Sequence, residues 1–228
     1  MTKVVIAIPK GREYKDGFVK SLLSLLLYEH SFSHYSISII MNEKPIPKGA
    51  NKYADIAEKR RQLIDDALLN GATHLLFLDD DMMFPPNTLR RLMSHKVPFV
   101  SGLGFMRKKP FYPTIFKTIT SRSGKVITEK HEFILEYPDI PFVVDGVGLF
   151  CCLIDLSIIP NLRTPLFETK GITSDSNIGE DLSFTRKLWE KGYKVLIDPA
   201  IKKGHIINDN QVIVEASFKH FVKDVNKV

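Results

Sequence analysis

The sequence predicts an α/β protein with a mainly parallel central sheet flanked by helices, in a single domain. Three observations support this fold class. Short apolar runs alternate with longer amphipathic segments through the first half of the chain. The length of 228 residues suits one globular domain. The apolar content of 44% argues against disorder, and no apolar run approaches the roughly 20 residues of a membrane-spanning helix.

Strands and helices alternate from the start of the chain. The runs with strand character are apolar and short, whereas the helical segments repeat apolar side chains every three to four positions. The predicted strands are residues 4–8, 36–41, 75–78 and a run that begins at 99. The predicted helices are residues 16–30, 51–69 and, after Pro86, 89–94. Because strands joined through helices usually pair in parallel, this order indicates a parallel sheet.

The second half of the chain has a less regular pattern, in which turn residues interrupt short apolar runs. Its predicted elements are a hairpin within 112–133, an apolar stretch at 142–154, a polar loop at 168–179, a helix at 181–191 that Gly192 ends, a strand at 195–197, and a peripheral strand and helix from about 208. We expect this half to complete the sheet and to form one side of a cleft.

Basic residues exceed acidic ones. Lys and Arg number 32 against 26 Asp and Glu, which gives a formal net charge of +6. Such an excess can serve a polyanionic partner, but the basic residues are spread along the chain and form no long block. A generally basic surface, or a small anionic substrate, therefore explains the charge better than a nucleic-acid-binding patch.

The two cysteines, Cys151 and Cys152, are adjacent in the sequence. Neighbours on an extended strand point to opposite faces, so we expect neither a disulfide between them nor a shared zinc ion. The chain also begins without the basic start and apolar run of a secretory signal. These features predict a reduced, cytoplasmic protein.

Three acidic residues follow the predicted strand at 75–78. Asp79, Asp80 and Asp81 come directly after Leu-Leu-Phe-Leu, and ligand sites of parallel sheets form at the carboxyl ends of strands. If the chain stays extended, Asp79 and Asp81 face the same side and can hold a hard divalent cation, with positions left for phosphate oxygens. The alternative is a solvated acidic turn before a pair of prolines.

The predicted helix at 51–69 carries an arginine within its apolar stripe. Arg60 lies between Ile56 and Leu63 at helical spacing, whereas Arg61 lies off the stripe. Since an unpaired buried charge is costly, Arg60 needs a partner, either a phosphate or one of the aspartates that follow the strand. The alternative is an arginine at the edge of the stripe whose head group reaches solvent.

Two further features complete the candidate chemistry. Glu180 and Asp181 open the predicted helix at 181–191, where a carboxylate is rigidly held and can act as a general base. The alternative is that both acids only cap the helix and interact with its dipole. His205 follows the strand at 195–197 after a glycine, and it is either a ligand or a structural histidine.

These features occur together in an order that resembles a known family. Glycosyltransferases with the A-type fold, particularly family 2-like enzymes, have a nucleotide-sugar half that is similar to IAEKRRQLIDDALLNGATHLLFLDDDMMFPPNTLRRL. Their acceptor-side half resembles GEDLSFTRKLWEKGYKVLIDPAIKKGHI, and the segment that lines their acceptor cleft resembles VDGVGLFCCLID. The resemblance covers roughly residues 3–207.

The resemblance implies a role for each motif. Asp79 and Asp81 match the Asp-x-Asp motif that holds the metal and the ribose and diphosphate of the donor. Asp181, with Glu180 beside it, matches the catalytic base of inverting members. The implied metal ligands are Asp79, Asp81 and His205. The implied donor-binding residues are Pro9, Lys10, Arg12, Arg60, Asp79 and Asp80.

The resemblance also implies Mn²⁺ or Mg²⁺ as cofactor, a nucleotide-sugar donor, and a glycan, lipid or protein acceptor. Peripheral contact with a membrane is compatible with the basic charge. Residues 1–107 then form a nucleotide-sugar-binding half, 108–207 an acceptor-binding and catalytic half, and 208–228 a peripheral C-terminal segment. One departure is that the family usually has an acid at the end of the second strand, where this chain has Asn42 and Glu43.

The sequence therefore predicts a metal-dependent glycosyltransferase that moves a single sugar from a nucleotide-sugar donor to an acceptor hydroxyl, with inversion and with Asp181 as general base. Two alternatives stay open. A nucleotidyltransferase of related α/β fold would need a glycine-rich phosphate loop, of which residues 9–12 are a faint match. A non-catalytic, basic nucleic-acid-binding module would need a patch of aromatic and basic residues, which the sequence does not favour.

Overall fold

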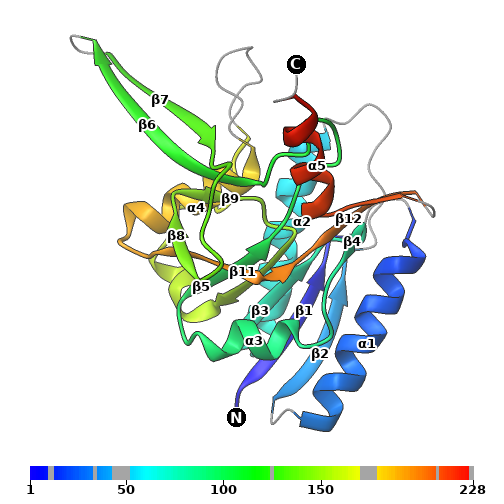
Figure 1. Cartoon of the computed structure of the whole chain (residues 1–228). Coiled ribbons are helices and arrows are strands. Elements are labelled where there is room, and N and C mark those ends of the chain that lie inside the picture. Colours follow the sequence, from blue (N-terminus) through cyan, green and yellow to red (C-terminus); the bar gives the residue numbers. More distant parts are fainter. Residues whose placement is uncertain are drawn as a thin grey trace.

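A central β-sheet positions the other elements of the molecule (Figure 1). The computed structural model describes residues 1–9, 13–32, 35–42, 52–123, 126–169, 179–208 and 211–225. Within these residues seven strands form the sheet, in the order β2-β1-β3-β10-β5-β11-β8. The strands are β1 (Lys3–Ile8), β2 (Ser36–Met41), β3 (His74–Leu78), β5 (Phe99–Leu103), β8 (Phe142–Val144), β10 (Cys151–Asp155) and β11 (Val195–Lys202).

The sheet is mainly parallel, as the sequence predicts. β1 pairs in parallel with both β2 and β3, and β11 pairs in parallel with β5. β10 is antiparallel to its neighbours β3 and β5, and β8 is antiparallel to β11 at the far edge. The carboxyl ends of β1, β3, β5 and β11 therefore lie at the same edge of the sheet, which is where α/β folds bind ligands.

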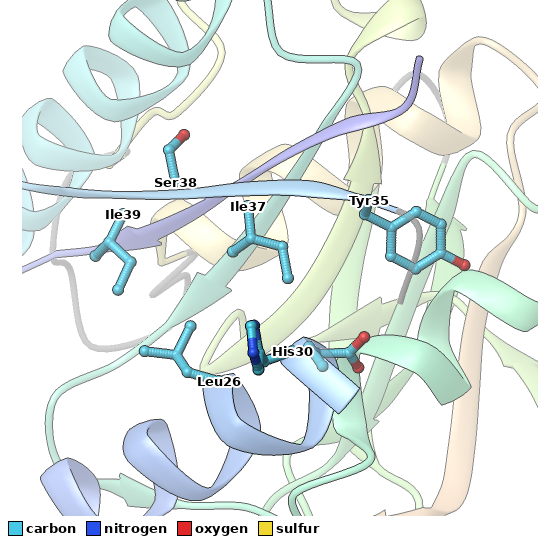
Figure 2. A pocket seen from close by; sticks show the side chains of 7 residues that line it. Leu26, His30, Tyr35, Ile37, Ser38 and Ile39 are labelled. Carbon is cyan, nitrogen blue, oxygen red and sulfur yellow. The ribbon is translucent and has the colours of Figure 1, made fainter. Parts of the chain in front are cut away.

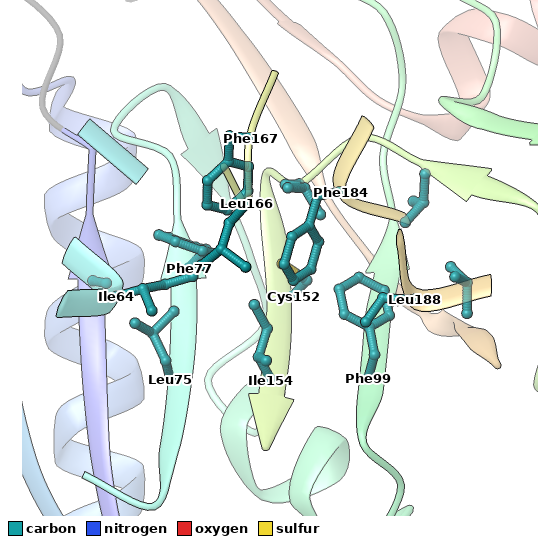
Figure 3. Close-up of a cluster of buried hydrophobic side chains, with 14 of the residues drawn as sticks. Ile64, Leu75, Phe77, Phe99, Cys152, Ile154, Leu166, Phe167, Phe184 and Leu188 are labelled. Atoms are coloured by element: carbon teal, nitrogen blue, oxygen red, sulfur yellow. The ribbon is translucent and has the colours of Figure 1, made fainter. Parts of the chain in front are cut away.

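Helices cover both faces of the sheet. The helices are α1 (Asp16–Phe32), α2 (Lys52–Leu69), α3 (Thr88–Ser94), α4 (Glu180–Glu190) and α5 (Glu215–Val225), with a short 3₁₀ helix, η1 (Leu156–Asn161). Side chains of α1 and α3 pack on one face, and side chains of α2, α4 and η1 pack on the other. Figure 3 shows the second of these clusters, in which Phe167 packs against both Phe77 of β3 and Phe184 of α4.

Residues of the strands alternate between the two clusters, because successive side chains of a strand point to opposite faces. Val5 and Ala7 belong to the cluster of α2 and α4, whereas Val4 and Ile6 belong to the other. The two cysteines of β10 divide in the same way and are free and buried. The prediction that they face opposite sides is confirmed.

Two small sheets complete the fold. One is formed by β4 (Met82–Met83), β12 (Gly204–Asn208) and β13 (Gln211–Ile213), and it joins the segment after β3 to the C-terminal part of the chain. The other is formed by β6 (Ile115–Ser123), β7 (Val126–Phe133) and β9 (Gly146–Val147). β6 and β7 are the predicted hairpin, which extends away from the body of the molecule at the top left of Figure 1.

The remaining sequence predictions differ from the structure in detail. The strand expected at 195–197 continues to Lys202, and the apolar stretch at 142–154 divides into three short strands. Gly192 has the positive φ of 78° expected of a glycine that ends a helix. The polar loop at 168–179 lies largely outside the described residues. No helix in the described ranges is both long and apolar enough to cross a membrane.

Candidate active site

A pocket of about 640 Å³ lies at the carboxyl ends of β1 and β3, between α2 and the start of α4. It gathers the residues that the sequence singles out from five separate segments of the chain. The predicted residues that line it are Pro9, Arg60, Asp79, Asp80, Asp81, Glu180, Asp181 and His205. Lys10 and Arg12, the other two predicted donor-binding residues, lie outside the described residues.

The chain turns immediately after β3, so the condition for Asp79 and Asp81 to face the same side, an extended segment, is not met. β3 ends at Leu78, and the backbone N–H of Met82 donates to the carbonyl oxygen of Asp79 at 3.2 Å. The turn arises because the next residues form β4, which pairs with β12 rather than continuing β3. As a result the carboxylates of Asp79 and Asp81 have different partners.

The buried side chain of Arg60 connects several groups of the site. Its side chain is only 2% exposed, and Nη2 donates to both carboxylate oxygens of Asp79, at 3.0 and 3.1 Å. Nη1 donates to the carbonyl oxygen of Leu149 at 3.2 Å, and Nε lies 3.6 Å from Oε1 of Glu180. Of the two partners that the sequence left open, the aspartate is the one this structure provides. Arg60 thus links β3, the segment before β10, and α4.

Burial affects the pKa of Asp79 more than its arginine partner does. Burial raises the pKa of Asp79 to about 6, although the charge of Arg60 opposes that rise. Its role as a metal ligand stays a prediction, and in this arrangement both oxygens accept hydrogen bonds from Arg60.

Asp81 and His205 both line the pocket and are in contact with each other. Oδ2 of Asp81 lies 3.2 Å from Nε2 of His205, and Nδ1 of the same ring lies 3.0 Å from the carbonyl oxygen of Phe105. Pairing of β12 with β4 sets this contact, because it places His205 opposite Met82. Burial alone would raise the pKa of Asp81, but the His205 contact and the charge of Arg107 outweigh it and lower that pKa.

The contact between His205 and Asp81 is either an ion pair or a place where the two side chains would share a divalent cation. A carbonyl oxygen can only accept, so Nδ1 carries a proton, and Nε2 then approaches a carboxylate favourably only if it is also protonated or if a cation lies between them. A histidine held through its other nitrogen by a carbonyl is typical of metal ligands. No group of three or more His, Cys, Asp or Glu side chains in the described part of the chain is arranged to hold a metal. A cation here would therefore complete its coordination with oxygens from a substrate or water.

The first turn of α4 holds the second acidic pair. Oδ1 of Asp181 accepts the backbone N–H of Leu182 at 2.8 Å, and a side chain at Gly179 would lie 2.7 Å from that same oxygen. Glycine at 179 therefore leaves room for the carboxylate. Burial, together with the neighbouring charge of Glu180, raises the pKa of Asp181 to about 7. A carboxylate with that pKa can exchange a proton near neutral pH, as a general base must.

Three lining features escaped the sequence analysis. Arg107, in the loop after β5, is 59% exposed and places Nη2 3.1 Å from Oδ2 of Asp81. Lys59 and Asp55 of α2 form an ion pair of 2.9 Å at the rim. Phe150 lies with its ring centroid 5.7 Å from that of His205. A run of basic residues at 107–109 is the one signal that could have suggested the first of them.

Comparison with known proteins gives fold similarity only. No family model and no curated protein matches the sequence. The chain is similar to A197 from STIV, with 15% identity, a TM-score of 0.58, and coverage of 95% of this chain and 92% of that chain. At this identity the likeness shows the α/β fold and not the function.

Two further solved structures match less well. One is a glycosyltransferase involved in the glycosylation of the major capsid of PBCV-1, with 11% identity, a TM-score of 0.39, and coverage of 71% of this chain and 63% of that chain. The other is a mutant of UDP-glucose pyrophosphorylase from Leishmania major, with 11% identity, a TM-score of 0.41, and coverage of 86% and 61%. With TM-scores this low, neither contributes to the argument.

Replacing Arg60 tests its structural role. Arg60→Met should lower the free energy of unfolding by about 3 kcal/mol or more, because Asp79 and Glu180 would lose their buried partner. The matched control is Arg61→Met, since Arg61 is 42% exposed and should change stability by less than about 0.5 kcal/mol. Urea unfolding at neutral pH measures both, and equal effects of the two variants would contradict the assignment.

Ionisation of Asp181 should lower the stability of the folded chain. Its pKa is about 7 in the folded chain, so the folded state keeps a proton that the unfolded state loses near pH 4, and stability falls as pH rises between those values. Asp181→Asn should therefore be more stable than the parent at pH 8, by about 4 kcal/mol, and equal to it below about pH 4. Unfolding at several pH values in EDTA measures this, with the exposed Asp65→Asn as control. A variant less stable at pH 8 would refute the assignment.

Proposed function

We propose that this chain is a metal-dependent glycosyltransferase that moves a single sugar from a nucleotide-sugar donor to an acceptor hydroxyl. The observation that carries the proposal is the gathering in one pocket of two distinct acidic groups with different environments. Asp81 faces a histidine and keeps a low pKa, whereas Asp181 is held at a helix start with a pKa near 7. The first suits a cation and the second suits proton transfer, and such separation of two carboxylates is typical of acid–base enzymes.

The donor side of the proposed reaction is formed by Asp81, His205 and Asp80. Asp81 and His205 would hold Mn²⁺ or Mg²⁺, which supplies Lewis-acid stabilisation of the negative charge on a departing nucleoside diphosphate. Arg107 shares Oδ2 of Asp81 and is exposed, so it is free to turn toward a diphosphate once a cation takes that oxygen. Pro9, which follows β1, lines the same pocket, and we assign it to the nucleoside of the donor.

The acceptor side is formed by the first turn of α4. The carboxylate of Asp181 would take the proton of the acceptor hydroxyl as that oxygen attacks the sugar. Burial and the charge of Glu180 keep the pKa of Asp181 high, and Oε1 of Glu180 lies 3.6 Å from Nε of Arg60. If Asp181 activates the acceptor hydroxyl for direct attack, the anomeric carbon is inverted. Retention would need a second carboxylate that attacks the sugar first. Arg60 contacts Asp79 after β3 and Glu180 at the start of α4, and so positions the two sides of the pocket. Its described hydrogen bonds and ion pairs are with protein groups.

Metal-dependent binding tests the donor side. Asp81→Asn should weaken Mn²⁺-dependent binding of a nucleoside diphosphate by at least about a hundredfold, because the amide removes the charge that balances the cation. Isothermal titration calorimetry with and without Mn²⁺ measures the effect. Asp65→Asn, an exposed carboxylate on α2, serves as the control and should bind like the parent. Unchanged titration by Asp81→Asn would remove this residue from the metal site.

Transfer kinetics test the acceptor side. Asp181→Asn should keep metal-dependent donor binding yet lower turnover by about a hundredfold or more, because it removes the base and little else. In the parent, turnover should rise with pH through about 7 as Asp181 loses its proton, and level off above that value. The assay follows release of nucleoside diphosphate; release of pyrophosphate instead would identify nucleotidyl transfer. Full turnover by Asp181→Asn would exclude it as base.

A further inference from the structure

Helix α1 exposes an apolar stripe far from the pocket. Phe18 and Leu25 are buried against the sheet, yet Val19, Leu23 and Leu27 are 39%, 55% and 70% exposed. Their spacing of four residues places these three side chains in one row along the helix. A helix that is apolar on both its inward and outward sides is expected to have a partner on each side.

Strand β2 lies beside α1 and is the outermost strand of the sheet. The N–H of Ser36 donates to Thr2 at 3.1 Å and that of Asn42 to Ile8 at 3.4 Å, so the even-numbered residues pair with β1. Backbone groups alternate in direction along a strand, and Ile37, Ile39 and Met41 therefore point their N–H and C=O groups outward. In the described part of the chain no strand pairs with this edge. β2 also lacks the charged residues and proline that usually protect an edge.

Helix α1 and strand β2 face each other across a shared hollow. Figure 2 shows Ile37 and Ile39 pointing toward Leu26 and His30 of α1, while Ser38 points to the other side of the sheet. This hollow has a volume of about 370 Å³. We name the surface formed by Val19, Leu23, Leu27, Ile37, Ile39 and Met41 the α1–β2 face.

We propose that the α1–β2 face is a two-fold interface with a second copy of this chain. An antiparallel pair of β2 strands centred on Ile39 places Ile37 of one copy opposite Met41 of the other. The N–H and C=O groups of all three outward-facing residues then form hydrogen bonds with the other strand. No outward-pointing backbone group of these three residues is left without a hydrogen-bond partner. The two sheets would join into one, as a self-complementary edge allows.

The same two-fold axis matches α1 to its own copy. Leu26 lies beside Ile37 and Ile39, and Leu23 lies about 4.5 Å further along the helix, close to the level of Ile39. Antiparallel helices that meet at Leu23 bring Val19 of one copy to Leu27 of the other. They also bring Asp16 opposite His30, a pair of complementary polar groups at each end of the stripe.

The size of the face suits a dimer. The 17 residues of α1 span about 25 Å, and the 6 residues of β2 span about 20 Å. With a width of roughly 20 Å for a helix beside a strand, each copy contributes about 500 Å², or about 1,000 Å² in total, which is the lower limit for a specific interface and fits a weak dimer.

Mass measurement and a charge substitution test the proposal. Light scattering at micromolar concentration should give twice the chain mass of 26.0 kDa. Leu23→Glu should raise the dimer dissociation constant by at least about a hundredfold, because the two glutamates would face each other across the axis. The matched control is Leu69→Glu, at an 85% exposed leucine of α2, which should remain dimeric. Circular dichroism checks that both variants are folded.

Cross-linking tests the register without a destabilising charge. Both native cysteines are buried, so a cysteine introduced on α1 would be the accessible thiol. Leu23→Cys should form a covalent dimer under mild oxidation. Leu27→Cys should not, because its two copies would be about 12 Å apart along the helix, beyond the reach of a disulfide.

Three outcomes would overturn the proposal. One is a monomer at every concentration. Another is equal cross-linking by Leu23→Cys and Leu27→Cys. The third is a monomer that floats with anionic phospholipid vesicles and loses this behaviour in Leu23→Glu, which would assign the stripe to a membrane surface instead.

Discussion

The buried guanidinium of Arg60 is the interaction on which the rest of the pocket depends. It is held between Asp79, which follows β3, and Glu180, which begins α4, so it fixes the two halves of the pocket relative to each other. The cost of burying a charge is recovered only if its partners are close and well oriented. Nη2 contacts both oxygens of Asp79, and the carbonyl of Leu149 accepts a hydrogen bond from Nη1. Within the described residues Nε forms no hydrogen bond and lies 3.6 Å from Oε1 of Glu180. Burial and the neighbouring charge of Glu180 raise the pKa of Asp181, and the charge of Arg60 opposes that rise.

The fold brings these groups together through two non-local pairings. β10 is inserted antiparallel between β3 and β5, which places Leu149 and Phe150 at the carboxyl end of β3. β12 pairs with β4 and delivers His205 to Asp81. Acidic groups that would repel one another in isolation are thus separated, one with an arginine, one with a histidine and one at a helix start. This separation supports different roles for them in the proposed reaction.

Much of this architecture follows from local sequence patterns. The apolar runs and helical spacings predict β1, β2, β3, α1, α2 and α4 closely, because burial on one or two faces imposes a period that a single segment displays. The insertion of β10 and the pairing of β4 with β12 could not be predicted, since strand order depends on distant partners. For that reason the turn at Asp79 was missed, and the partner of Arg60 was left open between a phosphate and an aspartate. Arg107 lies in a loop without periodicity, and only the structure places it beside Asp81.

The central claim is that the pocket binds a nucleotide sugar through a divalent cation. Thermal unfolding of the parent chain against a panel of nucleotide sugars, each with Mn²⁺, with Mg²⁺ and with EDTA, tests it most directly. The account predicts that at least one nucleotide sugar raises the unfolding temperature in the presence of metal and not in EDTA, because ligands that bind only the folded state stabilise it. An unfolding temperature that no nucleotide sugar changes under any metal condition would contradict the account.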